Sequence, residues 1–204
     1  MTCARLAVML LALGLAACGT TPPTRYLMLA VSPGAATDQA GDGLVLRPAV
    51  VRWPAAFDRL EVARPIGEVG VKVESLARWS AAPAQLAATT LTADLMGRLP
   101  GAVVAPWSET ATPEAVVVTA QVEALDERPS GYAMTAAVSV ARGAVVRRWT
   151  FQADAPGAHD PEGEARAVSQ LLGALAEQIA RALASGVSAP PEVSNPSASH
   201  RPGP

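Results

Sequence analysis

The sequence predicts an α+β domain with a mostly antiparallel sheet and two helices packed on one face. Three observations support this fold class. Apolar and polar residues alternate along residues 114–127, as expected for a strand with one buried and one solvent-exposed face. Two other segments repeat apolar residues every three or four positions, which is the helical period. No glycine-rich phosphate loop follows a predicted strand, so a doubly wound nucleotide-binding sheet is not supported.

Six segments have the pattern of strands. The first two are short apolar runs that end in proline-containing turns. In the third, Val69, Val71 and Val73 share one face, which we expect to be the buried one. The turn signals Arg128-Pro129-Ser130-Gly131 and Arg142-Gly143 join the last three strands into a meander. The predicted strands span residues 25–31, 44–52, 68–74, 114–127, 132–142 and 144–153.

The two helices are expected over residues 84–99 and 161–183. In the first, Ser80 is a plausible N-cap, and Pro83 falls in the first turn, where no amide donor is needed. In the second, Asp160 precedes Pro161 at the first helical position. Its apolar positions follow spacings of four, three, four and four, and this stripe predicts packing against the sheet: Val168, Leu172, Leu175, Ile179 and Leu183.

The composition argues against two function classes. The chain has 204 residues, 16 basic and 18 acidic, and a net charge of −2, which excludes nucleic-acid binding through a broad basic face. Two histidines, two cysteines and one lysine cannot supply a site of several His or Cys metal ligands or a Cys/His nucleophile pair. We therefore expect no enzyme activity, no catalytic residue and no bound metal.

The N-terminus has the features of a secretory signal peptide over residues 1–17. Arg5 is followed by a twelve-residue apolar run, which is too short to span a membrane, and by small residues. Leu15-Ala16-Ala17-Cys18 resembles the lipobox of bacterial lipoproteins. The resemblance implies that Cys18 carries covalent diacylglycerol and N-acyl lipid such as palmitate, with no other cofactor. Gly19 in place of aspartate implies the outer membrane by the same family rule.

The rest of the chain divides into three parts. Residues 18–24 are a short lipidated tether whose prolines and threonines favour extended backbone. Residues 25–185 are long enough for one α+β domain with a single core. Residues 186–204 are rich in proline and serine, and we expect this tail to be disordered because it buries too little apolar surface.

Two groups of side chains are candidate sites. His159 lies near acidic residues in the sequence and could ligate a metal, but its position before the Asp160 cap favours an exposed loop. Asp126-Glu127 has the pattern of a solvated turn. Large aromatics at element ends either cover the core or anchor a partner, and the pattern leaves both open: Trp53, Phe57, Trp79 and Trp107. Trp149 and Phe151, within a strand, are expected in the core.

Three segments carry a further resemblance. They are Tyr26-Leu27-Met28-Leu29, Trp53-Pro54-Ala55-Ala56-Phe57-Asp58-Arg59 and Arg78-Trp79-Ser80-Ala81-Ala82-Pro83. Together with the lipobox, their order and spacing resemble the ABC-type transport auxiliary lipoproteins of the PqiC type over most of residues 18–185. The chain departs from the family pattern at Leu60, where proline is usual, and after Trp79, where an acidic residue is common.

The resemblance implies a non-enzymatic lipoprotein on the periplasmic side of the outer membrane. It would dock the periplasm-spanning MCE protein of an intermembrane lipid transporter, and it could form a homo-oligomer. The alternatives are an envelope assembly or scaffold lipoprotein with no transport role and a periplasmic hydrolase. Hypothetical partner-binding residues lie in the second and third segments: Trp53, Phe57, Asp58, Arg59, Arg78 and Trp79.

We expect Cys18→Ser to remove the protein from the outer-membrane fraction without unfolding the domain, because no other anchor is predicted from the sequence. Fractionation after a high-salt wash measures the loss, and thermal unfolding checks the fold. A variant that stays in the outer-membrane fraction would contradict the lipoprotein assignment.

Overall fold

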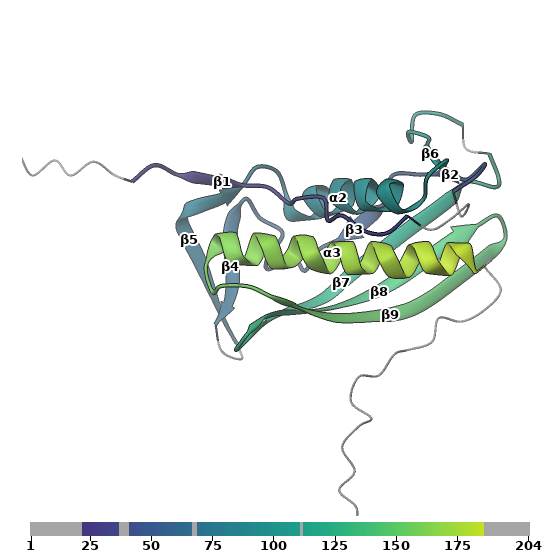
Figure 1. The fold of residues 1–204 in the computed structure, drawn as a ribbon. Coiled ribbons are helices and arrows are strands. Elements are labelled where there is room, and N and C mark those ends of the chain that lie inside the picture. The colour runs from purple at the N-terminus through teal and green to yellow at the C-terminus, as the bar shows by residue number, and fades with distance from the viewer. Residues whose placement is uncertain (1–21, 37–40, 67–68, 111, 186–204) are drawn as a thin grey trace, which may run out of the picture.

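The computed structural model describes residues 22–36, 41–66, 69–110 and 112–185. The predicted signal peptide, Cys18 and the tail over 186–204 lie outside these residues. Two helices lie side by side on one face of the main sheet, and a smaller sheet closes one end of the domain (Figure 1). The predicted α+β class is confirmed.

The main sheet is built on a meander of three long antiparallel strands, β7 (Val116–Arg128), β8 (Gly131–Arg142) and β9 (Val145–Pro156). The predicted turns are confirmed, and the predicted alternation is confirmed as far as Val122, with Val116, Val118, Ala120 and Val122 buried. The β8–β9 turn places Gly143 at φ 57, a left-handed conformation that glycine adopts without steric cost.

Three short strands extend this sheet beyond β7: β2 (Val45–Leu46), β3 (Val50–Arg52) and β6 (Val103–Val104). They pair in parallel, β2 with β6 and β7, and β3 with β7. The single strand predicted over residues 44–52 is thus wrong, because Pro48 has no amide hydrogen and interrupts the ladder. The next amide, Ala49 N–H, donates to Thr92 Oγ1 at 2.9 Å.

The smaller sheet has the order β1-β5-β4. Its strands are β1 (Arg25–Leu27), parallel to β5 (Gly70–Trp79), and β4 (Glu61–Ile66), antiparallel to β5. The sequence pattern missed β4, because Val62, Ala63 and Arg64 are buried in succession and do not alternate. Pro65 also argues against a strand, but β4 lies at a sheet edge, where proline is tolerated.

The expected burial of Val69, Val71 and Val73 is wrong. Val69 is 99% exposed and Val71 and Val73 are 45% and 42% exposed. The opposite face of β5 carries Lys72 and Glu74, and Glu74 forms an ion pair with buried Arg64 on β4. Alternation separates the two faces of a strand, but it does not say which face the rest of the chain covers.

Helix α2 (Pro83–Arg98) starts with Pro83 in its first turn, as predicted. Its N-cap residue is Ala82, with no side-chain cap of its own, so the prediction of Ser80 as the cap is wrong. The carboxylate of Asp58 instead accepts a hydrogen bond from Ala84 N–H at 3.2 Å. A residue 26 positions earlier in the chain satisfies one of the free amides at this helix end.

Helix α3 (Pro161–Ala184) begins as the sequence predicts. Asp160 is the N-cap, and its Oδ1 accepts from Gly163 N–H at 2.6 Å. Val168, Leu172, Leu175 and Ile179 are at most 1% exposed and pack in the main core with Leu91, Leu95 and Leu99. A second cluster lies under the smaller sheet and contains Leu27, Val62, Ala77, Trp79 and Ala165.

We expect Leu172→Ala to destabilise the domain by about 2–5 kcal/mol, because a fully buried leucine is lost and a cavity remains. Chemical denaturation measures the change. Val145→Ala is the matched control, since Val145 is 51% exposed at the β8–β9 turn. Equal stability of the two variants would contradict the core assignment.

Candidate functional site

The predicted partner-binding segment forms a tight turn between β3 and β4. Pro54 O accepts hydrogen bonds from Phe57 N–H at 2.9 Å and from Asp58 N–H at 3.0 Å. The same turn supplies Asp58 to the start of α2. Asp58 therefore has a structural contact, and the turn is fixed to the helix layer.

The aromatic residues of the two motifs differ in exposure. Trp79 is 5% exposed within the second core cluster, and half-buried Trp53 packs against the main core. Phe57 is also half-buried. Trp107, 55% exposed, lies 5.3 Å from the guanidinium carbon of Arg47, within cation–π range. Phe151 is buried as predicted, and half-buried Trp149 donates to Gln178 Oε1.

The charged residues of the motifs lie on the surface around one carboxylate. Glu61 on β4 is 3.3 Å from Arg59 Nε and 3.5 Å from Arg78 Nη2. Hydrogen bonds from its own backbone amide and from Arg59 lower the pKa of Glu61 below its usual value. Arg59 lies in the turn before β4, and Arg78 lies on β5. The two arginines meet because Glu61 on β4 pairs with Arg78 on β5.

These residues belong to a larger exposed surface, which we call the outer sheet face. Tyr26, Arg78 and Glu61 occupy neighbouring register positions across β1, β5 and β4. Val71 and Val73 of β5 and Val69 in the β4–β5 turn are exposed as well, toward the turn end of the small sheet. The outer sheet face is thus defined by Tyr26, Arg59, Glu61, Val69, Val71, Val73 and Arg78. It combines apolar and basic side chains.

The inner side of the same sheet holds a buried ion cluster. The Arg64 side chain is 8% exposed and lies 3.0 Å from Glu74 and 3.7 Å from Glu127. Lys72 Nζ is a further 2.8 Å partner of Glu74, and its hydrogen bond is the largest cause of the lowered pKa of the Glu74 carboxyl. Arg64 thereby joins β4 of the small sheet to β7 of the large one.

Glu164 in the first turn of α3 faces this cluster and is only 3% exposed. The pKa of Glu164 is raised to about 8: burial is the largest cause, Arg64 opposes the shift, and the nearby carboxylates of Glu127 and Glu74 contribute to it. The Glu164 carboxyl is therefore neutral over most of the physiological pH range. Burial also raises the pKa of the neighbouring Tyr132 hydroxyl.

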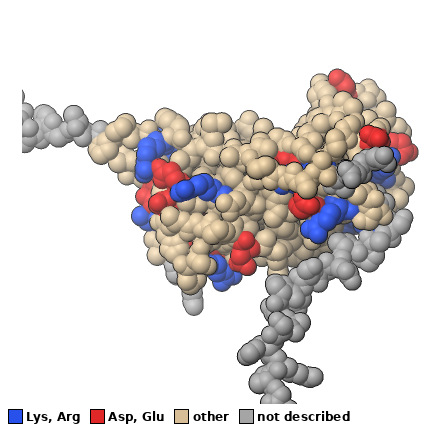
Figure 2. All heavy atoms as spheres, viewed as in Figure 1, with Lys and Arg blue, Asp and Glu red and all other residues tan. Residues whose placement is uncertain are grey.

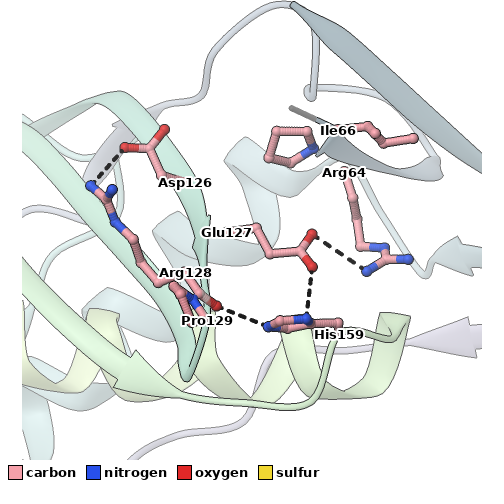
Figure 3. A pocket seen from close by; sticks show the side chains of 8 residues that line it. Arg64, Ile66, Asp126, Glu127, Arg128, Pro129 and His159 are labelled. Atoms are coloured by element: carbon pink, nitrogen blue, oxygen red, sulfur yellow. Dashed lines mark hydrogen bonds and ion pairs between the residues drawn. The ribbon is translucent and has the colours of Figure 1, made fainter. Parts of the chain in front are cut away.

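His159 lies at the rim of the cluster. Its Nδ1 is 3.1 Å from Glu127 Oε1, and its Nε2 is 2.9 Å from the carbonyl oxygen of Arg128 (Figure 3). The ring also stands edge-on to Tyr132. The expected solvated turn at Glu127 is wrong, because a bulge in β7 between Val122 and Ala124 shifts the later residues by one position. Glu127 then shares the inward side with Leu125.

A pocket of about 690 Å³ opens beside His159 (Figure 3). Its walls combine charged side chains with Pro65, Ile66 and Pro129. Over the residues that the structure describes, no three His, Cys, Asp or Glu side chains are grouped to hold a metal ion. The polar groups here hold β4, β7 and the start of α3 together.

The sequence analysis missed Arg64, Glu74 and Glu164. For Glu164 a signal was present: it precedes Val168 by four residues and so continues the apolar stripe of α3. An acidic residue on a buried stripe indicates a polar partner inside the domain. For Arg64 no comparable signal exists, since its partners Glu74 and Glu127 lie on two other strands, β5 and β7.

These observations define a two-helix α+β domain with an uncovered sheet face at one end. The model of the ABC-type transport auxiliary lipoprotein component matches residues 26–180. The chain therefore belongs to this lipoprotein family, as the motifs indicated, and is an auxiliary component associated with an ABC-type transporter. In the part of the chain described, neither helix combines the length and apolarity of a membrane span.

Solved structures share this fold. A crystal structure of an uncharacterized protein matches with a TM-score of 0.64 and 17% identity, over 78% of this chain and 98% of that one. A crystal structure of a Xanthomonas campestris protein matches with a TM-score of 0.55 and 14% identity, over 80% and 96% of the two chains. No curated protein matches the chain.

We expect Glu164→Gln to flatten the pH dependence of stability. The folded-state pKa of about 8 lies above the ordinary value of 4.5, so the protonated carboxyl stabilises the fold fully below pH 4.5, and this contribution is lost as pH rises through about 8. Glutamine keeps the neutral shape, so the variant should be more stable than the unmodified protein above pH 8. Thermal unfolding between pH 5 and 9 measures the difference.

The matched control is Glu114→Gln, because Glu114 has a 75% exposed side chain. Its melting curve against pH should parallel that of the unmodified protein. Parallel curves for Glu164→Gln as well would contradict a buried, neutral carboxyl.

Proposed function

We propose that this protein is anchored by lipid on Cys18 to the outer membrane and docks the periplasm-spanning MCE protein of an ABC-type lipid transporter. The outer sheet face is the observation that carries the docking proposal. The family match, which makes the protein an auxiliary part of an ABC-type transporter, supports a protein partner rather than a small substrate.

The outer sheet face has the composition of a protein-binding surface. Tyrosine and arginine are enriched at the centres of interfaces, where an apolar contact is bordered by polar groups. Here Arg59 and Arg78 flank Glu61, and the exposed valines of β5 provide an adjacent apolar area. A contiguous apolar area on a folded domain indicates an interaction site more often than scattered exposed residues do.

The backbone beneath these side chains is rigid. Trp79 N–H donates to Leu60 O at 2.7 Å, and Ser80 N–H donates to Leu27 O at 2.8 Å. Asp58 fixes the preceding turn to α2. Because little backbone freedom is lost when a partner binds, a preformed surface of this kind gains affinity at small entropic cost.

The six partner-binding residues suggested by the motifs have different roles in this proposal. We assign the partner contact to Arg59 and Arg78, with Phe57 at the margin of the surface. Trp53 and Trp79 support the surface from the two cores. Asp58 holds the turn that presents Arg59.

We expect Arg78→Ala and Arg59→Ala to weaken capture of the MCE protein without a change in melting temperature. Truncation of a central arginine costs about 2 kcal/mol of binding, which is roughly thirtyfold in affinity. Exposed ion pairs contribute little to folding, so thermal stability should stay constant. Co-purification from detergent-solubilised membranes and a titration with the purified MCE protein measure the effect.

Arg142→Ala is the control, since Arg142 is an exposed, ion-paired arginine at the end of β8 in the main sheet, outside the outer sheet face. Capture equal to that of the unmodified protein in both test variants would overturn the docking proposal. Retained lipid anchoring, together with capture of an envelope assembly protein in place of the MCE protein, would favour the scaffold alternative.

A further inference from the structure

The segment that follows β1 presents large apolar side chains to solvent. Tyr26 is 68% exposed, Met28 is 71% exposed and Val31 is 55% exposed. Leu27 and Leu29 alternate with Tyr26 and Met28 and pack against the core clusters. We call the exposed side chains Tyr26, Met28 and Val31 the N-terminal ridge.

The ridge is held firmly against the helix layer. Ala30 N–H donates to Ser169 Oγ at 3.0 Å, and Ser32 Oγ donates to the Ser169 carbonyl oxygen at 2.9 Å, both on α3. Ser32 N–H also donates to the fully buried carboxylate of Asp94 on α2 at 2.7 Å. The exposed apolar groups are therefore presented by a fixed backbone.

A shallow groove of about 460 Å³ separates the ridge from α3. Leu27, Met28, Ala30 and Ala165 supply its apolar wall, and the exposed Arg166 stands at its margin. Arg25 lies close by, in an ion pair with Glu162. In Figure 2, charged side chains gather at the left end of the domain, next to an uncharged stretch along its upper edge.

We propose that the N-terminal ridge lies in the headgroup region of the membrane to which the protein is anchored. This inference rests on the lipid anchor of the proposed function. Cys18 and Arg25 are seven residues apart, and an extended chain spans at most about 3.5 Å per residue, so Arg25, directly before the ridge, stays within roughly 25 Å of the acylated cysteine. The tether also leaves the domain at the strand that begins the ridge (Figure 1).

The chemistry of the ridge suits a lipid surface. Tyrosine places its ring in the apolar part of the interface and its hydroxyl in the wet part. Met28 and Val31 can enter the upper acyl region, and Arg25 and Arg166 can donate to lipid phosphates. Three side chains give a weak contact, but the anchor makes this contact intramolecular and so raises its effective concentration.

The outer sheet face is a poorer candidate for the same surface. Its valines lie toward the β4–β5 turn, at the far end of β5 from the positions that pair with β1. Membrane contact by the ridge leaves this part of the sheet open to a protein partner. The two surfaces meet at Tyr26, so the docking site would border the membrane.

The test uses the full lipidated chain, purified from membranes and incorporated into vesicles of phosphatidylethanolamine and phosphatidylglycerol. The mature protein would contain no free thiol, so Met28→Cys and Val31→Cys each give a single position for a nitroxide label. Electron paramagnetic resonance then compares collisions with a water-soluble nickel chelate and with oxygen, which concentrates in the bilayer. Val145→Cys, at the far end of the domain, is the matched control.

We expect labels at positions 28 and 31 to be several-fold less accessible to nickel, and more accessible to oxygen, than the label at position 145. Equal accessibility in a protein that sediments with the vesicles would overturn the membrane contact and leave the anchor intact. Protection from nickel without vesicles would also overturn it, since a protein contact would then cover the ridge. Failure to sediment with vesicles would overturn the anchor and this inference together.

Discussion

The arrangement of the two sheets depends on the ion pairs of Arg64 with Glu74 and Glu127. The Arg64 guanidinium is buried between β4, β5 and β7, where an unpaired charge would cost several kcal/mol. Glu74 and Glu127 compensate this charge from the two sheets, and they do so only while the small sheet turns its polar side inward. The valines of β5 then face outward. The exposed surface at this end of the domain follows from the need to pair one buried cation.

Much of the fold was predictable because it arises from local periodicity. The meander of β7, β8 and β9 follows from alternation and two turn signals, and α3 follows from the Asp160 cap and its apolar stripe. The failures have tertiary causes. The cap of α2 comes from a distant carboxylate, Asp58, and the burial of β5 depends on the partners of Arg64. Neither the Asp58 contact nor the burial of β5 can be predicted from a short stretch of neighbouring residues.

The candidate site was likewise predictable only in part. The motifs identified the turn around Asp58 and Arg59, and the spacing of α3 contained the position of Glu164. The convergence of Glu127, His159 and Arg64 was not accessible from the sequence, because it requires a bulge in β7 and the approach of β4. The aromatic residues were the more conspicuous feature of the motifs. Trp79, however, packs in the core, while the neighbouring Arg78 is exposed.

The hydrogen bonds from Ala30 and Ser32 to Ser169 join the first segment that the structure describes to α3, across as many as 139 positions. Contacts between such distant residues form late, because a long loop must close before they stabilise anything. β1 likewise pairs with β5 rather than with its neighbour in sequence. A nascent chain that lacks α3 cannot form these hydrogen bonds. The topology thus delays folding until α3 has been synthesised, which suits the export as an unfolded chain that the proposed lipid anchor requires.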